Sequence, residues 1–484
     1  MRTVPGTAAV PGTDGAGRAG VSTMPRTYDV IIVGAGPAGI FCALELSRAG
    51  DLEILLVDKG KGIEERECLA PSGPCRRCTP CNMLSGWGGA GAYSDGKLTL
   101  SSNIGGWLPE IVSRSKVDRL IKKVDGTYLE FGAPDRIFGD DEEKVNEIAR
   151  RAVRSDLVLV PARVRHMGTE VCPTVLKAMY EELQGKVEIL METEVEGIRV
   201  KDGVVKGVRT RDGRSIGSRY LVVAPGRSGA DWVKRLSADL GLHLENNAVD
   251  IGLRVEVPAV VMAPLTDDLY EPKLIYYSRS SEDRVRTFCM NPAGEVIKEY
   301  YDDVLTVNGH SFAEKRTENT NFALLVDKKF TEPFREPIAY GKYIARLANL
   351  LGDGILVQRL GDLLSGRRSD EKRIARSTVA PTLPDATPGD LALVLPFRYM
   401  SDILETLSAM NDLVPGVFSR NTLLYGIEVK FYSSRISVTP NLESEVANMF
   451  AAGDGAGITR GLVQASVSGL LAAESILQRE KKRT

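Results

Sequence analysis

The fold of this chain is decided by a stretch that reads Tyr28-Asp-Val-Ile-Ile-Val33, Gly34-Ala-Gly36-Pro37-Ala38-Gly39 and, after an apolar segment, Glu53-Ile-Leu-Leu-Val-Asp58. The pattern predicts a strand, a tight turn, a helix and a second strand. Such an arrangement binds a dinucleotide when its glycines are correctly spaced. Gly34 permits the turn, Gly36 lets the backbone approach a pyrophosphate, and Gly39 lets the helix pack closely on the strand.

The two ends of this unit complete the prediction. The helix begins at Pro37 and Ala38, and its N-terminus carries partial positive charge toward a phosphate. Asp58 follows Gly39 by 19 residues, which is about where an acid accepts both hydroxyls of an adenosine ribose. Lys59 lies beside it.

Composition narrows the class of protein. A chain of 484 residues with 43% hydrophobic residues can form two or three domains with buried cores. Its 62 basic and 64 acidic residues nearly cancel, which argues against nucleic acid and anionic membrane as partners. No run reaches the ~18 apolar residues of a membrane-spanning helix. Residues 1–26 lack the apolar core of a signal peptide and are expected to be a disordered extension.

Four of the seven cysteines lie close together, at Cys68, Cys75, Cys78 and Cys81. This clustering differs from a secreted disulfide framework and favours a reducing cytoplasm. Two successive Cys-x-x-Cys steps can bind zinc or an iron-sulfur cluster. The alternative is a thiol cluster that binds no metal.

Three further segments are typical of a flavin site. A glycine-rich loop runs from Gly86 to Lys97 and contains Gly89, Ala90 and Tyr93; it can lie flat against a ring. A strand ending in Ala224-Pro-Gly226 follows a predicted β-meander. Near the C-terminus, Gly453-Asp454-Gly-Ala-Gly precedes Thr459-Arg460-Gly461-Leu462, which opens a helix. We expect Asp454 to bind ribityl hydroxyls and the amides of residues 460–462 to face the flavin pyrimidine ring.

These segments predict an α/β protein, α+β overall, with a two-dinucleotide-type FAD domain and an inserted α+β substrate domain. The expected FAD domain is discontinuous and comprises residues 27–110, 160–248 and 426–484. Helical spacing at 117–128 and 141–154 predicts a helical cap at 111–159. Residues 249–425 form the expected substrate domain, and it contains Arg367 and Arg368, which could hold a substrate carboxylate.

The ordered motifs resemble those of uncharacterised FAD-dependent dehydrogenases, which are distant relatives of geranylgeranyl-reductase-like flavoproteins. The resemblance rests on Gly34–Gly39, Gly88–Lys97, Gly361–Arg368, Glu428–Ser433 and Ala452–Arg460. It implies a bound FAD and a substrate domain between the segments of the FAD domain. The chain departs from the family pattern Cys-Met-Cys-Pro-Gly-Gly, because Asn291 stands where the second cysteine is expected.

We expect an FAD-dependent oxidoreductase that moves a hydride between flavin N5 and a small organic substrate. Alternatives are a flavin monooxygenase and a non-redox flavoprotein that serves as a scaffold or modifies RNA. No second dinucleotide motif occurs, so NAD(P)H is expected only as a transient reductant, with an electron-carrier protein as the alternative. The candidate catalytic residues, chosen as proton donors in suitable contexts, are His166, Cys289, Tyr93, Lys97 and Lys430.

Overall fold

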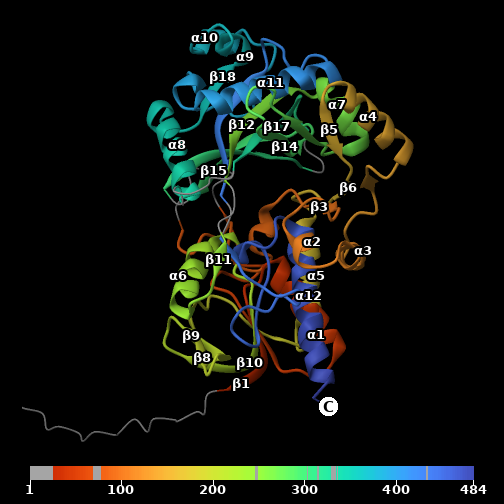
Figure 1. The fold of residues 1–484 in the computed structure, drawn as a ribbon, viewed down its shortest axis with the longest axis vertical. Helices are drawn as coiled ribbons and strands as arrows, with labels where there is room; N and C mark the ends of the chain where they lie inside the picture. Colours follow the sequence, from red (N-terminus) through yellow and green to blue (C-terminus); the bar gives the residue numbers. More distant parts are fainter. Residues whose placement is uncertain are drawn as a thin grey trace, which may run out of the picture.

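The computed structural model describes residues 26–68, 78–245, 249–301, 303–312, 316–328, 334, 336–431 and 434–483. They form two bodies stacked along the long axis of the molecule (Figure 1). The lower body is built on a seven-stranded sheet and the upper body on an eight-stranded sheet. Each sheet is the centre of its own apolar core.

The lower sheet joins a parallel layer to an antiparallel meander. Its strand order is β7-β2-β1-β10-β9-β8, and β22 also pairs with β10. Val30, Ile31 and Ile32 on β1 are fully buried, as expected for a parallel strand covered on both faces. The strands are β1 (Thr27–Val33), β2 (Ile54–Val57), β7 (Glu188–Leu190), β8 (Val195–Lys201), β9 (Val204–Thr210), β10 (Ser215–Val223) and β22 (Met449–Ala451).

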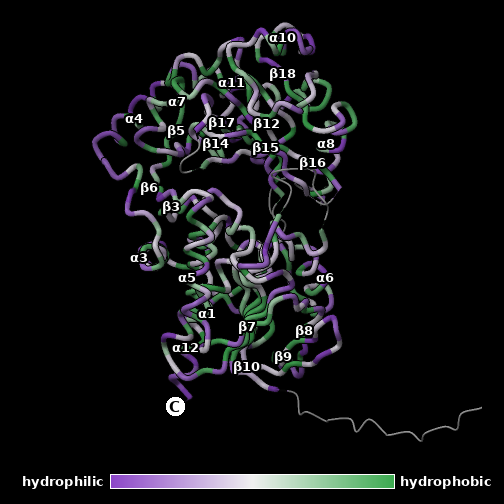
Figure 2. Tube along the Cα trace, turned by 180° about the vertical axis from the view of Figure 1, so that it is seen from behind, coloured by the Kyte–Doolittle hydropathy of each residue, from purple (hydrophilic) through white to green (hydrophobic). Residues whose placement is uncertain are grey.

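Helices α1 and α12 lie side by side along this sheet (Figures 1 and 2). Their close approach requires glycine, because a Cβ on Gly469 would lie 2.0 Å from the carbonyl oxygen of Ala38. The helices of the lower body are α1 (Pro37–Ala49), α2 (Leu108–Ile111), α3 (Arg114–Glu130), α5 (Cys172–Leu183), α6 (Ala230–Leu240) and α12 (Leu462–Lys481). Short 3-10 turns, η2 (Gly89–Tyr93), η3 (Arg227–Gly229) and η5 (Asp454–Ala456), lie at the upper end of this body.

The upper sheet has the order β19-β18-β20-β12-β17-β14-β13-β5. Its central strand β12 is buried along nearly its whole length. The strands are β5 (Leu157–Val160), β12 (Val249–Pro258), β13 (Lys273–Tyr277), β14 (Arg284–Asn291), β17 (Asn319–Lys328), β18 (Leu356–Arg359), β19 (Thr387–Pro388) and β20 (Leu423–Lys430). A hairpin of β15 (Glu295–Tyr301) and β16 (Val304–His310) lies beside it.

Helices cover the outer side of the upper sheet (Figure 1). They are α4 (Glu142–Arg154), α7 (Ala259–Leu269), α8 (Pro337–Gly352), α9 (Leu360–Leu363), α10 (Glu371–Ala375) and α11 (Phe397–Leu413), with η4 (Leu391–Leu393) between the last two. The buried apolar residues of the two bodies form separate clusters, and hydrophobic segments run through the interior of each body in Figure 2.

The two helices expected to form one cap belong to different cores. Val117 and Tyr128 of α3 are buried with the lower body, where Tyr128 packs on Phe41. Val145 and Ile148 of α4 are buried with the upper body. Each helix packs on the body that buries its apolar stripe. The chain therefore passes from the lower body to the upper body before α4 begins at residue 142.

Two small sheets complete the fold. β3 (Lys97–Leu100), β6 (Arg163–His166) and β4 (Ile137–Phe138) form one of them, with β6 in the middle. The other consists of β11 (Leu244–Glu245) and β21 (Arg435–Ile436). The α/β prediction is confirmed by this architecture. Among the residues that the structure describes, no helix is both long enough and apolar enough to cross a membrane.

Candidate functional site

Three of the predicted cofactor segments meet at the upper end of the lower sheet. β1, β10 and β22 run parallel and next to one another, so the turns at Gly34, Ala224 and Gly453 lie at the same edge. A Cβ on Gly34 would be only 2.0 Å from the Ala224 carbonyl oxygen. Gly34 also has a φ of 111°, a conformation that favours glycine. At Gly226, a nearby turn, φ is 64°.

Asp58 fixes the neighbouring turns. Its carboxylate accepts hydrogen bonds from the amides of Ala35 (2.9 Å), Gly60 (2.8 Å) and Gly86 (2.8 Å). These three backbone amides therefore compete with a ribose for the lone pairs of the Asp58 carboxylate. Contact between Asp58 and the ribose remains a prediction. Lys59 donates to the carbonyl of Ser228 at 3.1 Å, which ties the same turn to η3.

The glycine-rich loop is held by an arginine that sequence reasoning missed. The buried Arg66 donates to four backbone carbonyls, those of Asn82, Met83, Trp87 and Gly89. This arrangement sets the loop against the first turn, because Gly89 and Gly36 approach each other backbone to backbone.

Tyr93 belongs to the same arrangement. Its hydroxyl donates to the Arg66 carbonyl at 2.7 Å, and the Arg66 guanidinium lies 5.1 Å from its ring centroid. Tyr93 therefore supports the loop, which argues against its predicted catalytic role.

The C-terminal segment is closed by its own hydrogen bonds. Asp454 accepts from the Thr459 hydroxyl at 2.7 Å and from the Gly461 amide at 3.3 Å. The Arg460 amide donates to the Gly105 carbonyl at 2.6 Å. The expectation that all the amides of residues 460–462 face a flavin therefore needs correction, since two of them bond within the chain. Burial raises the pKa of Asp454 above its usual value, although Thr459 opposes this shift.

The residues at this edge fit an FAD. Helices α1 and α12 both begin directly after a glycine, Gly36 and Gly461, and neither has a side-chain cap, which leaves the helix ends for an anionic or polar ligand. Beside Asp58 lies a hollow of about 520 Å³, which is large enough for a nucleoside. It is lined by Lys59, Thr79, Pro80, Glu192, Thr193, Glu194, Arg211 and Asp212.

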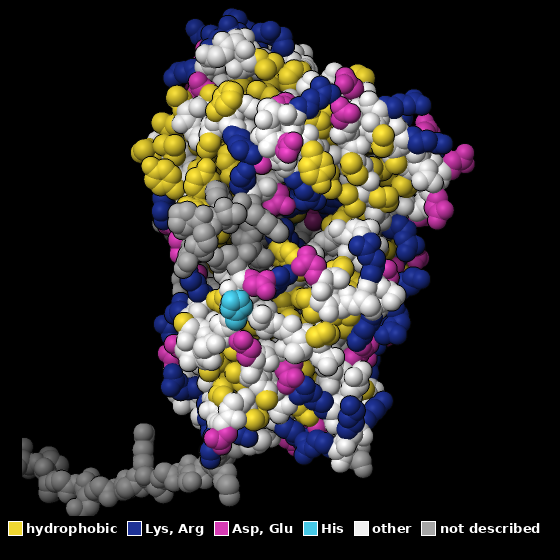
Figure 3. Space-filling model, in the orientation of Figure 1, with side chains coloured by type: hydrophobic (Ala, Val, Ile, Leu, Met, Phe, Trp, Pro, Cys, Tyr) yellow, Lys and Arg dark blue, Asp and Glu magenta, His cyan; other side chains and the backbone are white. Residues whose placement is uncertain are grey.

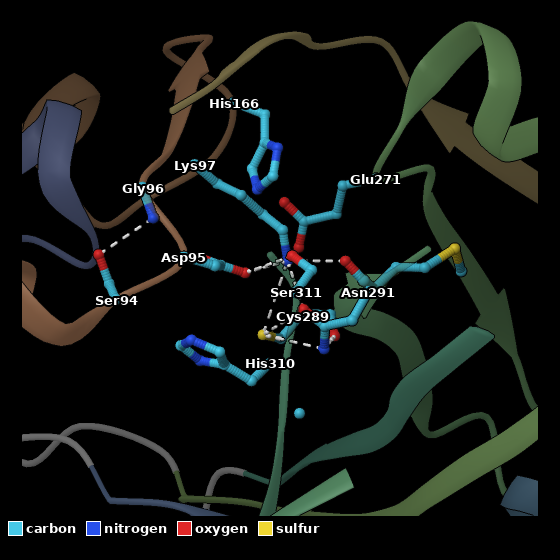
Figure 4. Close-up of polar contacts among 12 residues, drawn as sticks. Ser94, Asp95, Gly96, Lys97, His166, Glu271, Cys289, Asn291, His310 and Ser311 are labelled. Atoms are coloured by element: carbon cyan, nitrogen blue, oxygen red, sulfur yellow. Dashed lines mark hydrogen bonds and ion pairs between the residues drawn. The ribbon is translucent and has the colours of Figure 1, made fainter. Parts of the chain in front are cut away.

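A second group of polar residues lies where the upper body faces this edge. Lys97 on β3 reaches across to β14, where its ammonium donates to the Met290 carbonyl (2.7 Å) and to Asn291 Oδ1 (2.8 Å). Its third partner is Asp95 Oδ2 at 2.6 Å. Cys289 Sγ lies 4.0 Å away. Figure 4 shows these side chains converging on the ammonium from both bodies, and Figure 3 shows the surface hollowed between the bodies.

The charged side chains of this group stabilise each other in their charged forms. Burial disfavours the charge on Lys97, but Asp95, Cys289 and Glu271 outweigh that effect and raise its pKa above the usual value. For Asp95 burial is again opposed, chiefly by Lys97, and its pKa falls below the usual value. The side chain of Lys97 is 7% exposed and that of Asp95 is 13% exposed. The pair is therefore a buried ion pair that stays charged at neutral pH.

The backbone around Cys289 is strained. The ladder between β14 and β17 is irregular between Phe288 and Asn291, and Cys289 has a φ of 43°, which is unfavourable for a residue with a Cβ. Arg254 holds this conformation by donating to the Cys289 carbonyl at 3.1 Å. Bulges of this kind re-aim a side chain, and here the thiol lies near the Lys97 ammonium.

Arg254 is itself held by a buried carboxylate. Its guanidinium forms a two-pronged pair with Glu428 at 2.8 and 2.9 Å, and neither side chain is exposed. Asn321 accepts a further hydrogen bond at 2.7 Å. The pKa of Arg254 is raised because Glu428 and Cys289 outweigh the effect of burial. Arg254 therefore positions Cys289 and is saturated by protein partners.

Lys430, another predicted catalytic residue, links carboxylates rather than standing free. Its ammonium lies 3.1 Å from both Glu428 and Glu299. Glu299 also pairs with Arg227 of the lower body at 3.5 Å. Burial would raise the pKa of Glu299, but Lys430 and Arg227 lower it to about 2. This chain of charges bridges the two bodies on the side of η3.

Two histidines border the Lys97 group. His166 Nε2 lies 3.0 Å from the Tyr270 hydroxyl, and the two rings stack at 4.4 Å. His310 Nε2 lies 2.6 Å from the Thr169 hydroxyl. Burial, reinforced by Lys97, lowers the pKa of His166 to about 4. Burial also lowers the pKa of His310. Both rings are therefore neutral at pH 7.

The predicted metal site receives no support. Cys75 lies outside the described residues, and Cys68, Cys78 and Cys81 are free thiols. In the part of the chain that the structure covers, no three His, Cys, Asp or Glu side chains are placed to hold a metal ion. Zinc or iron-sulfur binding remains a prediction.

The structure does not bring Arg367 and Arg368 near the cofactor segments, and substrate binding by this pair stays a prediction. Both follow α9, at the end of the upper body far from the lower body (Figure 1). Arg367 pairs with the buried Asp362 at 3.0 Å. The motif Gly361–Arg368 therefore organises a local turn.

Several residues of the site escaped prediction because their partners are distant in sequence. Arg254 and Glu428 are 174 residues apart, and Tyr270 meets His166 across 104 residues. Asp95 could have been found, since a buried lysine two residues away in an apolar strand pattern requires a counter-charge.

Comparison with known proteins assigns the cofactor. Residues 29–70 match the family model "FAD binding domain", and residues 267–431 match "FAD-dependent protein, C-terminal domain-like". FAD is therefore the cofactor of this chain. The first match covers the turn at Gly34–Gly39 and Asp58, while the second covers most of the upper sheet. The FAD prediction is confirmed.

Whole-chain likenesses to known proteins are remote. An uncharacterized protein of Clostridium beijerinckii is 27% identical over 478 residues, which cover 93% of this chain and 80% of that protein. L-proline dehydrogenase from P. horikoshii has a TM-score of 0.41 at 12% identity, with 94% and 95% of the two chains covered. Glycine oxidase from Bacillus cereus has a TM-score of 0.37 at 14% identity, with 93% and 95% covered. Neither structural likeness is close enough to assign a substrate.

Proposed function

We propose that this FAD-dependent protein is an oxidoreductase that oxidises or reduces a small organic substrate in the space between its two bodies, with Lys97, Asp95 and Cys289 as the acid–base centre. The observation that carries the proposal is the reach of the Lys97 ammonium from β3 to the strained backbone of β14. A buried cation and a thiol are thereby held at the junction of the FAD-binding and upper bodies.

Each residue of this centre has a distinct role. When bound, FAD supplies the ring that accepts or donates a hydride. Lys97 stabilises negative charge that develops on the substrate and can donate a proton from Nζ. Asp95 orients that ammonium and keeps it charged. Cys289, 4.0 Å from Lys97 Nζ, exchanges a proton with the substrate.

Two features of the surroundings support this proposal. Arg254 and Lys97 together bond the Cys289 and Met290 carbonyls, so the thiol is presented by a fixed backbone. Asn291, which replaces the expected second cysteine, donates to the Cys289 carbonyl at 2.9 Å and accepts from Lys97. A single thiol at the centre favours proton transfer over reversible disulfide chemistry.

The electron donor and the cellular compartment are proposed on less direct observations. A nicotinamide would visit the centre transiently, or a carrier protein would deliver electrons. The six cysteines that the structure describes are all free, which suits a reducing cytoplasm.

Anaerobic stopped-flow measurements test the proposed centre. Flavin absorbance is followed while the FAD-loaded protein is mixed with NADH, NADPH and candidate substrates. Cys289→Ser and Lys97→Met should retain FAD but slow the substrate half-reaction by roughly 10²- to 10⁴-fold, the usual effect of losing a positioned acid or base. Lys186→Met, at a lysine whose side chain is 47% exposed on the lower body, should behave as wild type. Wild-type rates in both centre variants would refute the assignment.

A further inference from the structure

A chain of hydroxyl groups leads away from the acid–base centre. Ser311 Oγ donates to Asp95 Oδ2 at 3.4 Å, and the Tyr270 hydroxyl donates to Ser311 Oγ at 3.2 Å. The Tyr270 hydroxyl also lies 3.0 Å from His166 Nε2. Asp95 in turn lies 2.6 Å from Lys97 Nζ. Three polar groups, Tyr270, Ser311 and Asp95, thus connect His166 to Lys97 in sequence, and Figure 4 shows His166 and Ser311 close to that ammonium.

The hydrogen bonds of this chain all point the same way. A tyrosine hydroxyl has one proton, and that of Tyr270 is donated to Ser311. The Tyr270 oxygen must therefore accept from His166, so Nε2 of His166 carries the ring proton. Each group donates to the next until Asp95 is reached, which is the orientation that a proton needs to pass along the chain.

We propose that His166, Tyr270 and Ser311 form a proton relay that resupplies Lys97 through Asp95 after it has protonated a substrate. The proposal rests on the proposed function of the Lys97 centre. The three residues are positioning and relay groups that do not touch the reacting atoms.

The transfer balances without any electron change. Lys97 loses one proton to the substrate, and Ser311 then passes its proton through Asp95 Oδ2 to Lys97 Nζ. Ser311 regains a proton from Tyr270, Tyr270 regains one from His166 Nε2, and His166 takes one from water at Nδ1. Reorientation of the two hydroxyls and a change of ring tautomer then restore the starting state. The net result is one proton moved from solvent to Lys97.

Burial and backbone geometry suit this direction of flow. Ser311 is 0% and Tyr270 is 8% exposed, whereas His166 is only partly buried and forms the solvent end. Tyr270 has a φ of 57°, and a bulky residue persists in this conformation only when its surroundings require it. The strain places its hydroxyl between the two bodies.

The charged groups around His166 favour its role as a neutral carrier. It is influenced by Lys97 and Asp95 from the β3 segment, Glu170 from the following loop and Glu271 beside Tyr270. With its pKa lowered to about 4, chiefly by burial and then by Lys97, the ring does not retain an extra proton at neutral pH. A proton taken from water is therefore passed on.

The test uses Tyr270→Phe and Ser311→Ala in the FAD-loaded full chain, with Tyr276→Phe as the matched control at a buried tyrosine on β13 of the upper sheet. NADPH and menadione serve as probe donor and acceptor, because this two-electron reduction consumes one solvent proton. Each relay variant should lower kcat by roughly tenfold or more and change the pH profile and solvent isotope effect, with FAD content unchanged. The double variant should lose no more than either single variant, since both break one chain.

A second readout does not depend on turnover. The chain has three histidines, so ¹⁵N NMR of histidine-labelled protein can assign the His166 tautomer. Wild type should show a neutral ring protonated at Nε2, and Tyr270→Phe should shift that signal. A ring protonated at Nδ1 would overturn the relay, as would wild-type turnover and isotope effects in both variants. If the probes do not turn over, the proposed function loses support and the NMR result alone decides the relay.

Discussion

Arg254 and Glu428 show how a single residue pair can control the site. Both side chains are 0% exposed, and Arg254 bonds the carbonyl of Cys289 as well as Glu428. Removing one partner from such a pair leaves an uncompensated buried charge, which costs more than the pair itself contributes. The pair is therefore a sensitive point both for stability and for the position of the thiol.

We predict that Arg254→Met lowers the free energy of unfolding by about 3–5 kcal/mol, because Glu428 is left buried and unpaired. Urea denaturation followed by circular dichroism measures the change. The control is Arg346→Met at the Arg346–Asp303 pair, whose side chains are both 55% exposed. An exposed pair contributes at most about 1 kcal/mol. Equal effects of the two substitutions would contradict the assigned burial.

His166 should make stability depend on pH. Its pKa is lowered from 6.5 to about 4 in the folded protein, so between these values the unfolded chain binds a proton that the native protein does not. The contribution of neutral His166 to stability is therefore complete above pH 6.5 and is lost as pH falls toward 4. The effect should be on the order of 1–3 kcal/mol.

Comparison of wild type with His166→Gln isolates this contribution. The free energy of unfolding is measured by denaturant titration at several pH values from 4 to 7. The wild type should lose more stability than the variant across this range, so the difference between them should change steadily with pH. A difference that is constant with pH would show that His166 titrates normally.

At the scale of helices and strands, the cofactor edge depends on how closely α1 approaches α12. Gly469 and Gly39 both lie against backbone carbonyls, those of Ala38 and Gly34. These contacts fix the start of α1 above Gly36. The glycines of this helix pair therefore have two roles. They allow close backbone packing, and the first of them also let the backbone approach the pyrophosphate.

Gly469→Ala should destabilise the protein by roughly 1–3 kcal/mol, because its Cβ would overlap the Ala38 carbonyl and separate the helices. FAD affinity should fall with it. Gly126→Ala in α3 is the control, since a Cβ there meets no atom within 4 Å. Alanine is favoured in a helix by about 1 kcal/mol, so this variant should be neutral or stabilised. Melting temperature and FAD titration check both results.

Features that depend on a short local pattern are the ones that the sequence can predict. The turn at Gly34–Gly39, the strand into Gly226 and the segment from Gly453 are local patterns, and each has a defined backbone requirement, so all three were predicted. Arg66 and Tyr270 act through partners that only the folded chain brings near, and their local sequences carry no motif. Tyr93 and Lys97 lie in one loop, yet the sequence could not tell that the first supports the backbone and the second faces the upper body.

For the whole molecule, the two bodies meet through polar contacts. Lys97 with Met290, His310 with Thr169, and Arg227 with Glu299 each join one body to the other. These contacts surround the space in which the proposed chemistry takes place. The FAD-binding edge and Cys289 belong to different bodies, so the proposed chemistry requires that the thiol and the bound flavin share one environment.

Alkylation of Cys289 tests that requirement most directly. The FAD-loaded protein is treated with iodoacetamide, the modified cysteines are identified by peptide mass spectrometry, and flavin absorption and substrate half-reaction rates are recorded. Cys289→Ser, treated in the same way, controls for modification elsewhere. We predict that alkylation of Cys289 shifts the flavin spectrum and abolishes the half-reaction, with no such change in the treated variant. A protein alkylated at Cys289 that keeps an unchanged flavin spectrum and full reactivity would contradict the account.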